Sequence, residues 1–170
     1  MLEPHPASVA ISAADASRLS LRAVMGRSES VAELPGWARA LLQDARVAHL
    51  GLIDDANRPR VLPVTFALCG ERLVSAVDDK PKQVAPERLA RVRWLRDRPA
   101  AALTVDRYDE DWAQLAWVQA VGSISVLDAI EAAAEVSALV ARYEPYRTRP
   151  PSGPVLALDC DRLLWWRASS

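Results

Sequence analysis

The chain has 170 residues, of which 51% are hydrophobic, and a formal net charge of −1, so it can bury a core of its own and lacks the overall basic charge typical of proteins that bind nucleic acid. No stretch approaches the roughly 18 apolar residues of a membrane span, and the first residues lack the basic start and apolar run of a secretory signal. We therefore expect a cytoplasmic protein that binds neither a membrane nor nucleic acid.

The first 29 residues differ in composition from the rest of the chain. They are rich in Ser and Ala, contain prolines at positions 4 and 6, and show no sustained apolar period. This composition predicts a disordered or loosely attached tail. Residues 30–170 are expected to form one domain.

Helices and strands are both predicted along this domain. In chain order they are a helix over 31–45, strands over 46–53, 60–68 and 72–77, a helix over 86–97, strands over 101–105 and 115–127, a helix from Asp128 to about Tyr143, and a strand over 155–166. The first three strands are joined by short turns, which predicts an antiparallel meander. Six antiparallel strands with inserted helices fit a barrel better than a parallel sheet, which needs regular alternation of strand and helix.

The net charge is unevenly distributed along the chain. The chain contains only two lysines, Lys80 and Lys82, and both lie on the loop after the third predicted strand. Residues 80–98 include seven basic and two acidic side chains, a local charge of +5 on an otherwise acidic chain. One compact basic segment indicates a small anionic ligand.

Two arginines of the basic segment, Arg88 and Arg96, fall within the apolar arc of the predicted helix over 86–97. One interpretation is that their aliphatic stems cover the packed face while the charged groups extend into water. The other is that they hold an anion at the helix edge, because a buried guanidinium group needs a partner.

The remaining polar groups do not form a known catalytic arrangement. The acidic run from Asp106 to Asp111 is typical of a solvated turn more than of a cation site, and the isolated Cys69 and Cys160 predict buried thiols and no metal site. His49 alternates with apolar neighbours, as a packed or edge histidine does. An enzyme without an obvious acid, base or nucleophile takes its reactivity from a cofactor.

Several segments together resemble the flavin-binding split barrel of pyridoxamine-phosphate-oxidase-like proteins. They are the strands over 59–66 and 73–77, the Asp79-Lys-Pro-Lys82 loop, the helix over 89–99 and the strand over 101–105. The loop, with residues 106–118, is similar to the subgroup that uses the deazaflavin coenzyme F420. The resemblance covers about residues 33–167 and implies a mainly β fold, a six-stranded antiparallel split barrel with flanking helices. The Ser-Arg-Lys run of the older oxidases is absent, so oxidation of pyridoxamine phosphate is not expected.

The resemblance also implies a cofactor site. Basic residues would hold the cofactor phosphate, strand backbone would border the ring, and a tryptophan would reach the ring, often across a dimer. The implied phosphate residues are Lys80, Lys82 and Arg91, with Arg60 and Arg88 as further candidates; the ring residues are Leu62, Pro63, Val64, Thr65, Ser75, Ala76 and Trp117. The alternative is that the lysines are solvated loop charges and that Trp117 packs in the core or at an interface.

Two functions follow from these observations. The first is an oxidoreductase that transfers a hydride between reduced F420, or less favourably FMN, and a small organic substrate. The second is a non-catalytic module that holds FMN, F420 or haem, for which His49 would be the axial ligand. A homodimer is expected in either case, because six tryptophans, several in the last third of the chain, indicate apolar surface buried between subunits.

Overall fold

The computed structural model of the chain describes residues 22–78, 85 and 88–169. Its strands are β1 (Arg22–Ser28), β2 (Ala48–Ile53), β3 (Pro59–Val64), β4 (Ala67–Cys69), β5 (Arg72–Ala76), β6 (Ala100–Arg107), β7 (Ala116–Leu127) and β8 (Val155–Ser169). Its α-helices are α2 (Gly36–Asp44), α3 (Ala90–Asp97), α4 (Ala133–Arg142) and α5 (Glu144–Thr148), with short 3-10 turns η1 (Val31–Glu33) and η3 (Trp112–Gln114). The fold is mainly β and antiparallel, which confirms the expected class.

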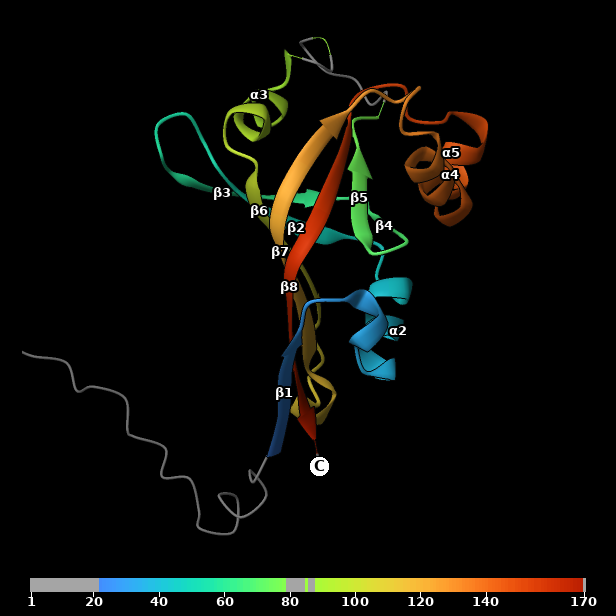
Figure 1. Ribbon diagram of the computed structural model, residues 1–170. Coiled ribbons are helices and arrows are strands. Elements are labelled where there is room, and N and C mark those ends of the chain that lie inside the picture. Colours follow the sequence, from blue (N-terminus) through green and yellow to red (C-terminus); the bar gives the residue numbers. More distant parts are fainter. Residues whose placement is uncertain (1–21, 79–84, 86–87, 170) are drawn as a thin grey trace, which may run out of the picture.

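The strands form one curled sheet in the order β3-β2-β6-β7-β8-β5-β4. Strands β7 and β8 pair along almost their whole length and form the spine of the molecule (Figure 1). The other edge of β8 is shared, because β5 pairs with its first residues and β1 pairs with residues 163–169. Residues 159–162 of β8 therefore lie between the ends of two different partner strands.

The sheet curls into a split barrel because one stretch of chain contributes to both of its ends. Strand β3 lies at one end of the strand order and β4 at the other, and only Thr65 and Phe66 separate them. Phe66 is fully buried in the main core, together with alternate residues of β2, β6, β7 and β8. This alternation places one face of each strand inside the barrel and the other outside.

Helices close the barrel at different places. Helix α2 buries Ala38 and Leu42 in the main core, and α3 does the same with Leu95. Helices α4 and α5 cover the outer side of β4, β5 and the first half of β8, where they form a second apolar cluster around Leu139. No helix among the described residues is long and apolar enough to cross a membrane.

Tyr143, between α4 and α5, fixes the bend between β3 and β4. Its hydroxyl accepts a hydrogen bond from the backbone N–H of Phe66 at 3.0 Å and lies 2.9 Å from the Phe66 carbonyl and 2.8 Å from that of Arg46. The side chain is buried. Because buried backbone groups must be paired, this hydroxyl replaces the strand partner that Phe66 lacks at the bend.

Three expectations from the sequence require correction. The tail expected over 1–29 is wrong for residues 22–28, which form β1, and residues 1–21 lie outside the described residues. The described residues contain eight strands where six were expected, because β1 is added and the strand over 60–68 is divided at the bend. The helix expected from Asp128 starts at Ala133; the Asp128 carboxylate instead accepts from the backbone N–H of Ile130 at 2.8 Å in the preceding turn.

Candidate cofactor site

Strand β3 offers an unpaired backbone edge. In the sheet order its only neighbour is β2, with Pro63 opposite His49. Proline has no N–H, so this pair cannot exchange hydrogen bonds, and the neighbouring residues Leu62 and Val64 must form the hydrogen-bonded pairs with β2. The carbonyl of Pro63 therefore faces away from β2 and is available to a ligand. Of the predicted ring-bordering run 62–65, the backbones of Leu62 and Val64 serve the sheet.

Thr65 is held at the end of this edge by a chain of hydroxyl groups. Its hydroxyl lies 2.8 Å from the hydroxyl of Tyr146, which in turn donates to the Asp78 carboxylate at 3.0 Å. Tyr146 is buried, and it comes from α5. This chain connects the end of β3 to the segment that leaves β5. The position of the Thr65 backbone therefore depends on two residues far away in the sequence.

Arg91 is a half-buried cation at the start of α3. Its Nε atom is buried and has no hydrogen-bond partner among the described residues. Burial lowers the pKa of the Arg91 guanidinium, against the opposing effect of the nearby Asp78 carboxylate. A desolvated guanidinium group with an unused donor is suited to an anionic ligand.

The start of α3 adds backbone donors beside Arg91: the N–H groups of Ala90 and Arg91 have no hydrogen-bond partner among the described residues, whereas the N–H of Val92 already donates to the carbonyl of Leu89 at 3.0 Å. The helix begins at Ala90 after Leu89, whose side chain has no acceptor to cap it. The first N–H groups of a helix have no partner within the helix, and they carry a partial positive charge. Arg91 and these N–H groups together fit a phosphate group.

The other two predicted arginines are not equivalent to Arg91. Arg60 stacks over the Trp94 ring, with its guanidinium carbon 5.5 Å from the ring centroid, and lies 3.8 Å from the Asp54 carboxylate. It is therefore already used in packing α3 against the β2–β3 turn. Arg88 is exposed immediately before α3. Arg91 is the predicted basic residue that the structure equips best for an anion.

Ser75 and Ala76 are buried near the end of β5, and their side chains point to opposite faces of the sheet. Ser75 shares a face with Leu73, which lies in the main core, whereas Ala76 packs in the second cluster under α4 and α5. The two side chains therefore cannot both contact the ring of a cofactor. Only the backbone atoms of Ser75 and Ala76 could both border it. Lys80 and Lys82 lie outside the described residues, so their predicted role stays a prediction.

Trp117 is not brought together with Arg91 within one chain. It is the second residue of β7, opposite Asp106 and Trp166. Helix α3 joins the sheet near Ile124, whose N–H donates to the carbonyl of Pro99 at 2.8 Å. Ile124 lies seven positions after Trp117 along the strand, which corresponds to about 23 Å. Within one chain, Trp117 and the start of α3 therefore lie near opposite ends of β7.

His49 and Asp106 form a pair that links two neighbouring strands. The Nδ1 atom of His49 on β2 lies 3.5 Å from the Asp106 carboxylate on β6, and both side chains are about half exposed. The two residues share the outer face of the sheet with Pro63 and Trp117, because paired residues point to the same side. The expectation of a packed or edge histidine is therefore wrong: β2 lies between β3 and β6 in the sheet, and the half-exposed His49 has a carboxylate neighbour.

Neither a reactive thiol nor a metal cluster appears in this part of the chain. Burial raises the pKa of the Cys160 thiol to about 11, and burial also raises that of Cys69. Both groups are therefore protonated at neutral pH and are poor nucleophiles. No group of three or more potential metal ligands occurs among the residues that the structure describes.

Several site residues were not predicted from the sequence. They are Tyr146, Asp78 and Trp94 around the α3 end, and Asp106 as the partner of His49. Tyr146 and Thr65 are 81 positions apart, and the contact arises only when α5 covers β5. A buried tyrosine has to find a hydrogen-bond partner, and this was the only signal that the sequence offered.

The fold and this site define a class of protein: a small antiparallel split β-barrel with an open strand edge and, at one end, a helix start beside a half-buried arginine. The sequence profile of the family described as pyridoxamine 5'-phosphate oxidase matches residues 37–162. The chain belongs to this family of split barrels. No match was found among curated proteins.

Solved structures with the same fold include proteins with different cofactors. One is an FAD-binding protein from Mesorhizobium loti (TM-score 0.58, 16% identity, 89% of this chain and 100% of that chain). Another is an FAD and haem binding protein from Mycobacterium smegmatis (TM-score 0.61, 20% identity, 85% of this chain and 74% of that chain). A third is named F420 reductase (0.53, 21%, 81% and 97%). At these identities the likeness shows the fold alone.

Proposed function

We propose that the protein is an F420-dependent oxidoreductase acting on a small organic substrate. Reduced F420, when bound, supplies a hydride to an unsaturated acceptor. The chain itself contributes the binding and orientation of cofactor and substrate. The F420 reductase among the solved structures of this fold supports the choice of cofactor.

The observation that carries this proposal is Arg91. Its half-buried guanidinium group keeps an unused buried donor beside the uncapped start of α3. In the proposed complex Arg91 and the first N–H groups of α3 bind the cofactor phosphate, and Lys80 and Lys82 bind the anionic tail beyond it. The open edge of β3 then offers the carbonyl of Pro63 and the backbone of Thr65 to the polar edge of the ring.

We propose further that the functional unit is a homodimer. Within one chain Trp117 lies on the outer face of the sheet, about 23 Å along β7 from the position where α3 joins it. A second subunit packed on this face would bring Trp117 toward the site at Arg91. The dimer would therefore complete the ring pocket.

The second candidate function is storage or transport of a flavin or of haem. His49 supports it, because its Nδ1 atom faces Asp106 at 3.5 Å, which leaves Nε2 free to ligate an iron. A carboxylate behind a histidine is the usual support of a metal-ligating imidazole. The FAD and haem binding protein of the same fold is consistent with this alternative.

The test is titration of the purified protein with F420, FMN and haem, followed by absorbance and by quenching of fluorescence. We expect F420 to bind most tightly. Replacing both Lys80 and Lys82 by Ala should weaken F420 binding by roughly tenfold to a thousandfold, since two charge-assisted contacts are lost. Arg91→Gln should weaken it at least about tenfold, and both losses should shrink at high salt.

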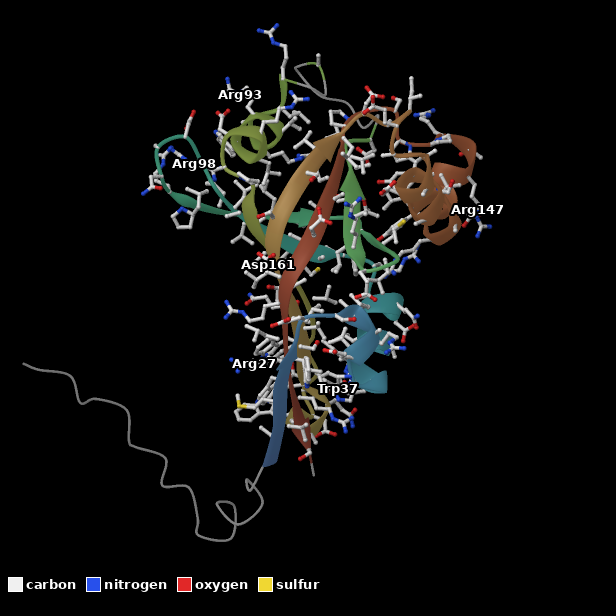
Figure 2. All side chains as sticks on the ribbon, in the orientation of Figure 1. Arg27, Trp37, Arg93, Arg98, Arg147 and Asp161 are labelled. Carbon is white, nitrogen blue, oxygen red and sulfur yellow. The ribbon has the colours of Figure 1, made fainter. Side chains whose placement is uncertain are left out.

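Arg147→Gln is the matched control, because Arg147 is exposed on α5, away from α3 (Figure 2). It should leave the affinity unchanged. If the affinity for F420 is unchanged in both the Lys80/Lys82 and the Arg91 variants, the cofactor phosphate does not bind at this end of the barrel. A Soret band with haem that is lost in His49→Ala, without binding of F420, would favour the second function.

A further inference from the structure

A separate cavity of about 380 Å³ lies between α2 and the sheet. We call it the α2 pocket. Its main lining residues are Trp37, Leu41 and Ala45 from the helix side and Arg107, Ala116 and Arg167 from the sheet side. Figure 2 shows Trp37 beside α2, at the opposite end of the molecule from Arg93 and Arg98 around α3. The α2 pocket is thus distinct from the candidate cofactor site of the same chain.

Arg167 is the central polar residue of the α2 pocket. Its guanidinium carbon lies 5.1 Å from the centroid of the Trp37 ring, so the two flat groups are stacked. Its Nε atom is buried and has no hydrogen-bond partner in the described part of the chain, and no ion pair to Arg167 is found there. A partly desolvated cation is thus held in place by an aromatic ring and keeps its donors unused.

The strand register explains why there is room in front of Arg167. Its neighbour on β7 is Ala116, whose small side chain cannot fill the space, and its neighbour on β1 is Val24. Leu41 and Ala45 contribute apolar surface that also packs against the main core. The α2 pocket therefore combines an apolar wall with one fixed guanidinium group.

The other charged groups of the α2 pocket are already engaged or lie apart from Arg167. Arg107 donates from Nε to the carbonyl of Gln114 at 2.9 Å, which fixes the side chain and leaves its terminal nitrogens for a ligand. Asp106 faces His49, and Asp44 is exposed at the end of α2. Neither carboxylate comes within ion-pair distance of Arg167. These two acids oppose a ligand with more than one negative charge.

We propose that the α2 pocket binds a small aromatic monocarboxylate. The carboxylate would pair with the guanidinium groups of Arg167 and Arg107, whose planar donors match its two oxygens. The ring would lie against Leu41, Ala45 and Ala116. The volume of the cavity falls within the usual range of small-molecule sites, and its character, mostly apolar with a few fixed polar groups, is typical of them. This inference does not depend on the proposed use of F420.

The probe for this proposal is 2-naphthoate, titrated into the full chain by calorimetry at low ionic strength. We expect saturable binding of one molecule per chain. The uncharged 2-naphthamide should bind at least about tenfold more weakly, since it cannot form the charge-assisted pair. Arg167→Gln should weaken 2-naphthoate binding by a similar factor.

Two further variants make the result decisive. Arg162→Gln removes an exposed arginine of the same strand that does not line the α2 pocket, and it should leave binding unchanged. Ala40→Leu places a larger side chain at an exposed lining position of α2 and should weaken binding while the helix is retained, so it decides the question even if Arg167→Gln fails to fold. Absence of saturable binding to the wild-type chain, or equal affinity in Arg167→Gln and the wild type, would overturn the proposal.

Discussion

Asp54 is a fully buried carboxylate in the turn between β2 and β3. It accepts hydrogen bonds from the backbone N–H groups of Ala56 and Arg58 at 3.0 and 2.9 Å and from the side chain of Arg58 at 3.0 Å. The turn also contains Asn57 with φ of 59°, a left-handed conformation that Asn tolerates. Arg98, just beyond α3, donates to the Asp54 carbonyl. The Asp54 carboxylate thus fixes the turn, and its backbone carbonyl joins the turn to the α3 region.

The pH dependence of stability should report this arrangement. The backbone N–H of Arg58 lowers the pKa of Asp54, burial partly opposes this, and the Arg58 side chain lowers it further. A carboxylate with a lowered folded-state pKa contributes stability above its unfolded pKa of about 3.9, and this contribution is lost as pH falls through the folded-state value. We expect Asp54→Asn to lower the melting temperature at pH 7, and the difference from the wild type to shrink below about pH 4.

Thermal unfolding followed by circular dichroism at pH 7 and pH 3 measures this difference. Asp55→Asn is the matched control. Asp55 lies in the same turn, but it is exposed, and its ion pair with the exposed Arg93 is long, at 3.9 Å, so little stability should be lost. A melting temperature of Asp54→Asn equal to that of the wild type at pH 7 would contradict the structural role of this carboxylate.

At the residue scale, the sequence predicted the basic residue of the candidate site better than it predicted the hydrogen bonds that position the neighbouring backbone. Arg91 could be chosen because it lies in a basic segment at a predicted helix start, and the structure gives it an unused donor. The chain from Thr65 through Tyr146 to Asp78 could not be predicted, because it depends on how α5 packs on β5. His49 and Asp106 meet because β2 and β6 are neighbours in the sheet, although three other strands lie between them in the sequence.

At the scale of elements, β1 is the strand that the sequence did not predict. Strand alternation is readable when one face is buried, but Val24, Met25 and Arg27 of β1 are all exposed. The strand forms because β8 extends beyond β5 and offers a free edge. The bend at Thr65 and Phe66 was invisible for a different reason: the apolar run continues through it. Most other strands and helices could be predicted, since their apolar positions face a core.

The contact between Gly26 and Trp165 makes β1 sensitive to one methyl group. A Cβ atom at Gly26 would lie 2.5 Å from the Trp165 ring, closer than side chains approach one another. We expect Gly26→Ala to destabilise the protein by about 1 to 3 kcal/mol, the usual cost of overpacking, or to detach β1 from β8. Urea unfolding and hydrogen exchange of residues 22–28 measure the two outcomes.

Gly36→Ala is the control for this substitution. Gly36 begins α2, and a Cβ atom there would have no neighbour within 4 Å. It should leave stability unchanged or raise it slightly, because Ala favours a helix over Gly. Equal stability of the two variants, with full protection of β1, would show that Trp165 moves aside without cost.

At the scale of the whole molecule, the outer face of the sheet around β1 carries adjacent large apolar side chains. Met25, Trp166 and Trp117 are neighbours across β1, β8 and β7 and point to the same side. Helix α2 packs on the other, core face. Such a patch is typical of a surface that another protein covers.

The proposed homodimer can be tested on this face. We expect the wild-type chain to sediment at twice its chain mass at micromolar concentration. Met25→Glu should raise the dissociation constant of the dimer at least about tenfold, because the new carboxylate would be buried in the interface without a partner. Ile130→Glu, at an 89% exposed position in the turn before α4, should not. A wild-type chain that sediments as a monomer would remove the dimer and, with it, the proposed reach of Trp117.

The position of β8 also bears on the order of assembly. Strands β1 and β5 belong to the first half of the chain, yet each pairs with β8, close to residue 170, and so does β7. A sheet built from such distant pairings closes slowly, because the intervening chain must be ordered first. During synthesis, the backbone edges of β1, β5 and β7 that pair with β8 would stay unpaired until β8 has left the ribosome. The nascent chain is therefore expected to need protection from aggregation until β8 can pair with these strands.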